Sequence, residues 1–318
     1  ASHANPLGYG SNHQNIPKHS KLGKKYRDCL VSRPGRIFVM CDQVSAEDWL
    51  IQGIIADQTG DTHGLDELRD RSIDRHQKLA SFIFAVPADQ CDRDANTPYR
   101  YIGKRTRYAG SYGMGADKFA AVLAKEGYSV PKEHCTYILR KFHEYEPAIQ
   151  SVFQSYVEKE VTDKRTLHDL FGRERQFFGL HPYRDNAKIF REAFSYIPQS
   201  SVGDNTGAAI NWLEATAPGL VVMETHDAVV LEVDDCESSV VNVVGLLEQA
   251  FDRTLRFPRG LELKLPVEHV LGYYLQATIR CDNVSEIGLK NTLNTYKQRR
   301  SPLMTIISGV QLPSLLQV

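Results

Sequence analysis

Residues 219–233 read Gly-Leu-Val-Val-Met-Glu-Thr-His-Asp-Ala-Val-Val-Leu-Glu-Val. Two apolar runs of strand length flank the polar pair His226-Asp227, which predicts a β-hairpin with that pair at its tip. A further apolar run, Arg36-Ile-Phe-Val-Met-Cys41, is followed at once by Asp42 and then by a helical pattern. The sequence therefore predicts a sheet in which two strands each present an aspartate at one end.

The stretch between these strands has a mostly helical pattern, from about residue 66 to residue 190, with prolines at the breaks. A further helix is expected near Val202 to Glu214, just before the hairpin. Residues after Gln276 mix polar and apolar side chains without a clear period, and we expect an appendage there. The fold class is thus α+β, with a helical insertion between the parts of an antiparallel sheet.

The composition is that of a globular protein, with 42% hydrophobic and 24% charged residues among 318. The formal net charge is −1, so any contact with a nucleic acid must come from local clusters of basic residues. No segment approaches the roughly 18 consecutive apolar residues of a membrane span, and we expect no membrane partner. The six cysteines show no C-x-x-C spacing, which indicates reduced thiols in a cytoplasm-like compartment.

Basic residues gather in and just after the polar N-terminal stretch of residues 1–25. They are Lys18, Lys21, Lys24, Lys25 and Arg27. The cluster is a candidate for phosphate contacts, and the alternative interpretation is a solvated surface loop.

Asp42 and Asp227 are candidate metal ligands. Each alone would be an ordinary polar residue at a strand end. Together, at one edge of a sheet, they offer the hard oxygen ligands that Mg²⁺ prefers. Two ions held roughly 3.5–4 Å apart can activate an attacking hydroxyl and stabilise a leaving oxygen, so the pair indicates phosphoryl transfer.

A stripe of side chains supports this interpretation. Arg100, Lys104, Tyr108 and Tyr112 recur at i, i+4 spacing, so on a helix they share one face. Cations suit the phosphates of a nucleoside triphosphate, and aromatic rings suit its sugar and base. An exposed ladder of basic residues is the alternative, but such a ladder would not normally carry tyrosines in register.

The order of these motifs resembles the palm and fingers of family A DNA polymerases, the bacterial DNA polymerase I class. The resemblance extends from the first few residues to about Gln276. The motifs that carry it are Gln14-Asn-Ile-Pro17, Asp42 with Glu47, Asp74-Arg-His76, the Arg100 to Gly113 helix, Arg191 with Gln199, and His226-Asp227. It implies a right-hand palm, an antiparallel sheet with helices, in residues 1–60 and 189–276, mostly helical fingers in residues 61–188, and a C-terminal tail in residues 277–318.

The resemblance implies a role for each matching side chain around an incoming deoxynucleotide. Asp42 and Asp227 would hold two Mg²⁺ ions, for which Mn²⁺ can substitute. Lys104 would act in catalysis and, with Arg100 and His76, would contact the triphosphate, where positive charge offsets the charge on the phosphoryl oxygens. Glu47 would be the steric gate that excludes a 2′-hydroxyl. Tyr108 would pack on the sugar, as in relatives that accept dideoxynucleotides, and Tyr112 would guard the insertion site.

Primer-template DNA is the expected partner, bound through its backbone and minor groove without sequence readout. The DNA-binding residues that the resemblance and the basic cluster indicate are Gln14, Asn15, Lys24, Lys25, Arg27, Arg173, Arg191, Gln199 and His226.

The chain departs from the family pattern at three places. Motif C usually reads His-Asp-Glu, and Ala228 stands here at the third position. Gln43-Val-Ser-Ala replaces the usual Tyr-Ser-Gln-Ile after Asp42, and Trp49 stands about where an arginine is common. The sequence begins just inside the first motif, so we expect the thumb and exonuclease to lie on a separate chain or to have been removed. Residues Gln311-Leu-Pro-Ser-Leu-Leu316 faintly resemble a peptide that docks on sliding clamps.

The function that the sequence predicts is DNA-templated DNA polymerisation in a reduced, DNA-containing compartment such as the cytoplasm of a bacterial or phage-infected cell. A single-subunit RNA polymerase is a less favoured alternative, because Glu47 disfavours ribonucleotides. The other alternative is a catalytically impaired polymerase-like subunit that binds DNA, which the missing acid at Ala228 suggests.

Overall fold

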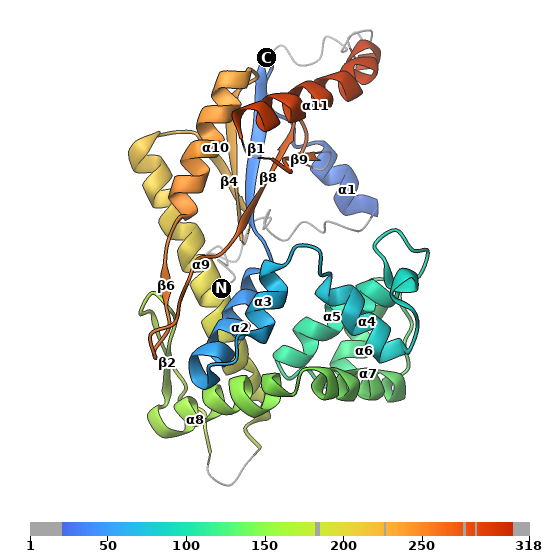
Figure 1. Cartoon of the computed structure of the whole chain (residues 1–318), viewed down its shortest axis with the longest axis vertical. Helices are drawn as coiled ribbons and strands as arrows, with labels where there is room; N and C mark the ends of the chain where they lie inside the picture. The colour runs from blue at the N-terminus through green and yellow to red at the C-terminus, as the bar shows by residue number, and fades with distance from the viewer. Residues whose placement is uncertain (1–20, 182–184, 226, 276–277, 284, 308–318) are drawn as a thin grey trace, which may run out of the picture. The chain divides into compact units, whose positions relative to one another are not determined.

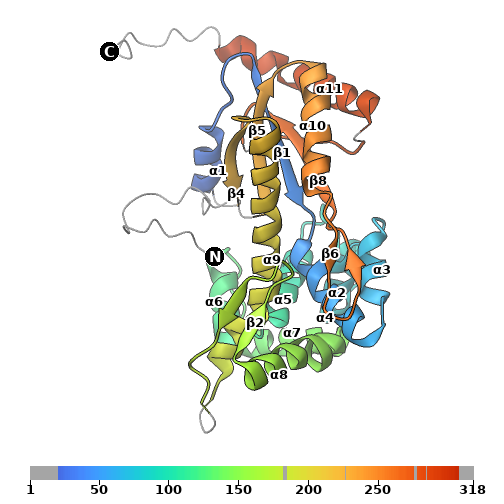
Figure 2. The same cartoon turned by 90° about the vertical axis from the view of Figure 1, so that its left-hand side faces the viewer.

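The computed structural model describes residues 21–181, 185–225, 227–275, 278–283 and 285–307. Internal contacts divide the chain into two compact units. Unit 1 is built from Ser45–Asp204 and Arg253–Leu265, and unit 2 from Ser2–Val44, Asn205–Asp252 and Pro266–Val318. Each unit is described by itself, with the element labels of Figures 1 and 2.

Unit 2 contains a five-stranded antiparallel sheet with the strand order β4-β5-β1-β8-β9. Its strands are β1 (Arg36–Gln43), β4 (Val221–Thr225), β5 (Ala228–Asp234), β8 (Val267–Gly272) and β9 (Ile279–Arg280). Strands β4 and β5 form the hairpin predicted from residues 219–233. Strand β1 confirms the predicted strand and continues through Asp42. The antiparallel sheet and the predicted α+β class are therefore confirmed.

One face of this sheet is covered by helices α10 (Glu237–Phe251) and α11 (Glu286–Ile307) and by the last turns of α9 (Ala187–Thr216) (Figures 1 and 2). Successive residues of a strand point to opposite faces. Ile37, Val39 and Cys41 of β1 therefore join the helix-covered core, whereas Phe38 and Met40 belong to a smaller cluster on the other face. That other face is the one Asp42 shares.

The region after Gln276 includes the ordered helix α11. Leu289, Leu293 and Tyr296 are buried in the core of unit 2, and their spacing puts them on one side of the helix. These three apolar residues are surrounded by polar ones, so the sequence shows no clear helical period of hydrophobic residues. Helix α1 (Lys21–Asp28) also belongs to unit 2.

Unit 1 is mostly helical, as predicted, and has its own apolar core. Its helices are α2 (Ala46–Thr59), α3 (His63–Arg69), α4 (Arg75–Phe84), η2 (Ala88–Cys91), α5 (Tyr99–Ser111), α6 (Ala116–Lys125), α7 (Lys132–Tyr145), η3 (Ile149–Gln154) and α8 (Ser155–Lys164). Two short hairpins were not expected: β2 (Thr166–His168) with β3 (Glu174–Gln176), and β6 (Leu255–Arg256) with β7 (Glu262–Leu263).

Helix α9 begins at Ala187, well before the helix expected near Val202, and contains Pro198. It contributes residues to both units. None of the helices in the described ranges is long and apolar enough to cross a membrane.

Candidate functional site

Asp42 and Asp227 lie at the same end of two neighbouring strands of unit 2. Asp42 in β1 is paired with Ala228, the first residue of β5. The backbone N–H of Gln43 donates a hydrogen bond to the carbonyl oxygen of Asp227 at 3.2 Å. The two aspartates are thus one residue apart across an antiparallel ladder, as the sequence predicts. His226 lies outside the described residues.

Gln43 anchors this strand end to helix α9. Its side chain is buried, with 2% exposure. Its Nε2 donates to the hydroxyl of Thr206 at 2.8 Å, and its Oε1 accepts from Nδ2 of Asn205 at 2.7 Å. The substitution that departs from the family pattern therefore has a clear structural use, because it fixes the backbone between the two aspartates. A lone glutamine in the sequence gives no signal for this role.

Glu268 of β8 is a third carboxylate in this part of the sheet that sequence reasoning missed. It is paired with Asp42 on the side of β1 opposite to Ala228, and its Oε2 lies 3.0 Å from Nη2 of Arg280. In the part of the chain that the structure describes, no three His, Cys, Asp or Glu side chains are arranged to hold a metal ion. The donor chemistry of Asp42 and Asp227, two carboxylates at strand ends, nevertheless fits Mg²⁺, which binds through one or two carboxylates plus water and substrate phosphates.

Helix α5 of unit 1 carries the predicted stripe. Lys104 is exposed and Arg100 and Tyr108 are partly exposed, whereas Ile102 and Ala109 on the other side are buried. Tyr112 is the C-terminal cap residue of the helix. The predicted helix is therefore confirmed, with Arg100, Lys104 and Tyr108 on its accessible side and Tyr112 packed against the core of unit 1.

Arg100 forms an ion pair with Asp74, with 2.7 Å between Nε and Oδ2. Asp74 also caps α4, because its Oδ1 accepts the backbone N–H groups of His76 and Gln77. Burial raises the pKa of the Asp74 carboxyl, but the hydrogen bonds from Arg100 and Gln77 lower it further, so the net pKa lies below its usual value. A phosphate bound by Arg100 would have to displace this carboxylate.

The surroundings of His76 favour the neutral form of its imidazole near pH 7. Burial lowers the pKa of its imidazole to about 3, and the positive charge of Arg107 adds to the effect. Its Nδ1 is buried and accepts or donates no hydrogen bond among the described residues. A positive charge on His76, which the resemblance implies, would therefore need a bound anion that favours the protonated imidazole.

The lowered pKa of His76 predicts a loss of stability in mild acid. Between pH 7 and pH 5 the imidazole is protonated in the unfolded chain, whose pKa is near 6.5, but not in the folded one. Stability should fall as pH falls, by about 2 kcal/mol over this range from this group alone. His76→Gln should remove that part of the pH dependence, as measured by urea unfolding at both pH values. An identical pH dependence in the variant would contradict the assignment.

Glu47 and Tyr112 are joined in unit 1. The hydroxyl of Tyr112 donates a hydrogen bond to Oε2 of Glu47. Burial raises the pKa of Tyr112 well above its usual value, and the negative charge of Glu47 raises it further. The tyrosine therefore remains a hydrogen-bond donor over the physiological range, and it holds the carboxylate of the predicted gate in one place.

The predicted DNA-binding residues differ in how accessible they are. Lys24 and Lys25 of α1 are exposed. Arg27 is 8% exposed and its Nη2 donates to the carbonyl oxygen of Leu275 at 3.2 Å, which counts against a DNA contact by this side chain. Gln14 and Asn15, together with the clamp-like peptide Gln311–Leu316, lie outside the described residues.

Arg173 is exposed but makes a two-bond ion pair with Asp204, with distances of 2.8 Å from Nε and 2.5 Å from Nη2. This pair raises the pKa of the guanidinium. A DNA phosphate would have to compete with Asp204 for it.

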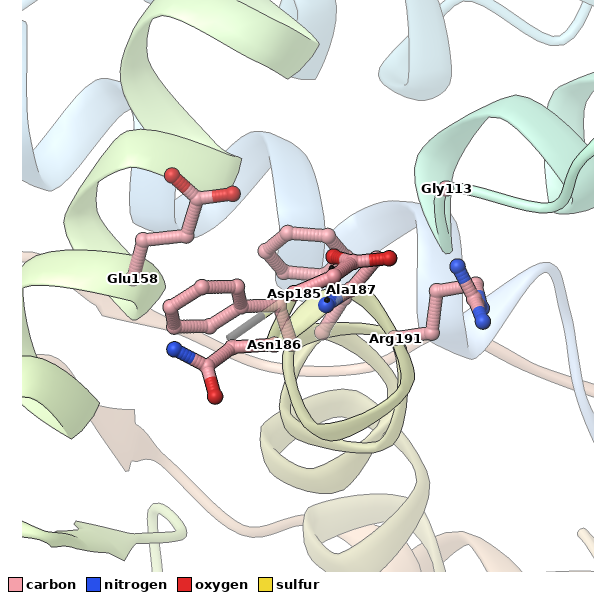
Figure 3. Close-up of a pocket in the computed structure, with 8 residues that line it drawn as sticks. Gly113, Glu158, Asp185, Asn186, Ala187 and Arg191 are labelled. Atoms are coloured by element: carbon pink, nitrogen blue, oxygen red, sulfur yellow. Dashed lines mark hydrogen bonds between the residues drawn. The ribbon is translucent and has the colours of Figure 1, made fainter. Parts of the chain in front are cut away.

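Arg191 lines a pocket of about 420 Å³ inside unit 1 (Figure 3). The pocket is also lined by Gly113 after helix α5, Glu158 of α8, Asn186 just before α9, and Phe190 in α9. Burial raises the pKa of Glu158. Gln199, two turns further along α9, is exposed.

Comparison with known proteins gives consistent results. The family model described as "DNA polymerase family A" matches residues 9–273. The thermostable DNA polymerase I of Thermus thermophilus is 24% identical over 264 residues, which are 80% of this chain and 29% of that protein. DNA polymerase I of Treponema pallidum is 26% identical over 260 residues, 80% of this chain and 25% of that protein. The chain thus spans well under half the length of these curated relatives.

A solved structure shares the fold. It is described as the POL domain of Pol1 from M. smegmatis in complex with DNA primer-template and dNTP, and it superposes with a TM-score of 0.64 at 21% identity. The match covers 84% of this chain and 45% of the other. Because the family match spans most of the sequence, and the palm-like sheet and helical unit agree with it, the chain belongs to DNA polymerase family A.

Proposed function

We propose that this chain is the palm and fingers of a DNA-templated DNA polymerase that adds deoxynucleotides to the 3′-hydroxyl of a primer. The observation that carries the proposal is the placement of Asp42 and Asp227 at the same end of the adjacent strands β1 and β5. Family membership adds the class of reaction, and the accessible stripe on α5 adds a surface suited to a triphosphate.

Asp42 and Asp227 would hold two divalent ions, Mg²⁺ or its substitute Mn²⁺. When bound, such ions increase the nucleophilicity of the primer hydroxyl and stabilise the leaving pyrophosphate oxygen. The protein's own part is to fix the two carboxylates. The two carboxylates are fixed by the ladder between β1 and β5 and by the anchored side chain of Gln43.

The residues of unit 1 would bind the nucleotide. Lys104 and Arg100 would neutralise the triphosphate, with Arg100 exchanging Asp74 for phosphate. His76 would donate a hydrogen bond to phosphate as a neutral imidazole, or take up a proton when the anion arrives. Glu47, held by Tyr112, would occupy the space of a 2′-hydroxyl.

Lys24, Lys25, Arg191 and Gln199 would bind primer-template DNA, with Arg173 joining if DNA displaces Asp204. The related POL domain was solved with DNA primer-template and dNTP, which supports both partners. Such contacts to the backbone should weaken steeply as salt concentration rises. The domain boundaries that we propose are residues 1–60, 61–188, 189–276 and 277–318. The compartment that we propose is reduced, and the six free cysteines are compatible with it.

Tyr108 predicts ready acceptance of dideoxynucleotides. A phenolic hydroxyl beside the sugar can replace the hydrogen bond that the missing 3′-hydroxyl would make. Tyr108→Phe should therefore raise the preference for deoxy- over dideoxynucleotides by about tenfold or more, measured as a ratio of kcat/KM values. Dideoxynucleotides that fail to stop extension by the natural chain would contradict the assignment.

Primer extension tests the proposed function. The chain is incubated with Mg²⁺, a DNA primer-template and either deoxy- or ribonucleotides, at low salt and with enzyme in excess over DNA. Extension with deoxynucleotides alone is the expected result. Efficient use of ribonucleotides would instead indicate an RNA polymerase, and no incorporation of either, even when a thumb-bearing chain is added, would indicate the impaired subunit that Ala228 suggests.

A further inference from the structure

A cluster of buried charges lies inside unit 1, with members from helices α2, α3, α4 and α5 and from the residue that follows α7. Five side chains, each at most 12% exposed, form the cluster: Asp48, Glu67, Arg75, Arg107 and Glu146. Arg75 lies at the centre, because its nitrogens are 2.5 Å from Asp48, 3.1 Å from Glu146 and 3.2 Å from Glu67. Arg107 donates one bond to Glu146 and another, of 3.3 Å, to the carbonyl oxygen of Arg75.

The charges of this cluster balance. Two guanidinium groups and the ammonium of Lys78, which lies 2.8 Å from Glu67, face three carboxylates. Burial raises the pKa of Asp48, but Arg107 and Arg75 lower it further, so its net pKa is lowered and it is ionised. Buried ion pairs of this kind add little net stability compared with apolar side chains of similar size. Stability alone therefore does not explain why five helices share such a cluster.

Three cluster residues are chain neighbours of side chains assigned to the incoming nucleotide. The pairs are Asp48 with Glu47, Arg75 with His76, and Arg107 with Tyr108. Consecutive residues of an α-helix point about 100° apart, so each cluster residue and its chain neighbour belong to the same turn. Fixing the rotation and axial position of the cluster residue fixes its neighbour as well.

We propose that this buried cluster sets the relative positions of Glu47, His76 and Tyr108, and through them the affinity for the nucleotide and the discrimination of its sugar. The planar guanidinium groups of Arg75 and Arg107 donate hydrogen bonds to carboxylates only at defined angles, whereas apolar contacts leave helices free to slide slightly. Binding sites need side chains fixed to within about 0.5 Å. This inference rests on the proposed function, and the five cluster residues would be positioning residues rather than groups that touch the substrate.

An apolar version of the cluster separates positioning from folding. The variant Asp48→Leu/Arg75→Met/Arg107→Met/Glu146→Gln removes both guanidinium groups, leaves Glu67 paired with Lys78, and keeps a partner for Gln52, which donates to Glu146. Its thermal unfolding temperature should equal or exceed that of the natural chain. We expect KM for deoxynucleotides to rise about tenfold and the deoxy-to-ribo ratio of kcat/KM to fall about tenfold, with kcat at saturation changing less.

The control removes an exposed ion pair from the same unit. Arg140→Met/Glu144→Gln disrupts the pair at i, i+4 on α7, whose side chains are 59% and 39% exposed, and should leave KM and the sugar ratio unchanged. A folded cluster variant with the natural KM and the natural sugar ratio would overturn the inference.

A second variant tests the positioning role of the cluster if the first does not fold. Arg107→Lys keeps the charge but cannot reach Glu146 and the carbonyl of Arg75 together. It should raise KM and lower the sugar ratio in the same direction, and unchanged values would overturn the inference. If the natural chain extends no primer, both the proposed function and this inference are wrong. If the natural chain extends primers and the variants keep its KM and sugar ratio, only this inference is wrong.

Discussion

Replacing Asp227 by asparagine is expected to lower primer extension about a thousandfold. The change keeps the size of the side chain but removes a negative charge from one of the two carboxylates assigned to the metals. Metal stabilisation of the transferring phosphoryl group contributes several kcal/mol to the transition state, and about 4 kcal/mol corresponds to this factor. Asp42→Asn should have an effect of similar size. Single-turnover extension with saturating deoxynucleotide measures both.

Strand β5 offers a matched control. Asp234 is the last residue of the same strand and pairs with Arg36 at 2.5 Å on the surface. Asp234→Asn removes the same charge at the opposite end of the strand, and an exposed pair contributes little. It should extend primers at the natural rate. The assignment fails if Asp227→Asn also extends at that rate while remaining folded.

Glu47→Ala is expected to open the site to ribonucleotides. If the carboxylate excludes a 2′-hydroxyl by occupying its space, removing it relieves a clash of about 3 kcal/mol, so the deoxy-to-ribo ratio of kcat/KM should fall about a hundredfold. The ratio is measured by primer extension with one nucleotide of each sugar.

Glu47→Gln distinguishes exclusion by size from exclusion by charge. Glutamine keeps the volume and still accepts the hydrogen bond from Tyr112, so a steric gate should remain closed in this variant. If both variants retained the natural sugar ratio, Glu47 would not be the gate, and the main argument against an RNA polymerase would be lost.

The parts of the fold that sequence predicts are those with strong local signals. Strands β1, β4 and β5 are apolar runs that end in polar residues, and both the hairpin and the antiparallel pairing follow from them. The early start of α9 is hidden because Pro198 normally ends or kinks a helix. The β2–β3 hairpin has strands of only three residues, too short to show a period.

The candidate site also has parts that the sequence predicts and parts that it does not. The approach of Asp42 to Asp227 follows from two strand ends, and the stripe on α5 follows from helical spacing. Asp48, Arg75 and Arg107 look like surface charges in the sequence, because only tertiary packing brings their helices together. The neutral state of His76 depends on that same burial. Long-range electrostatics of this kind has no signature in a single sequence.

Counting bound metal ions tests the roles of Asp42 and Asp227 without relying on product formation. Mn²⁺ is titrated into the natural chain bound to a dideoxy-terminated primer on its template with the next correct deoxynucleotide, and bound Mn²⁺ is followed by electron paramagnetic resonance. We predict two bound ions per complex, and about tenfold weaker binding or loss of an ion in both Asp42→Asn and Asp227→Asn. If both variants bound Mn²⁺ with the same number of ions and the same affinity as the natural chain, Asp42 and Asp227 would not be the metal ligands.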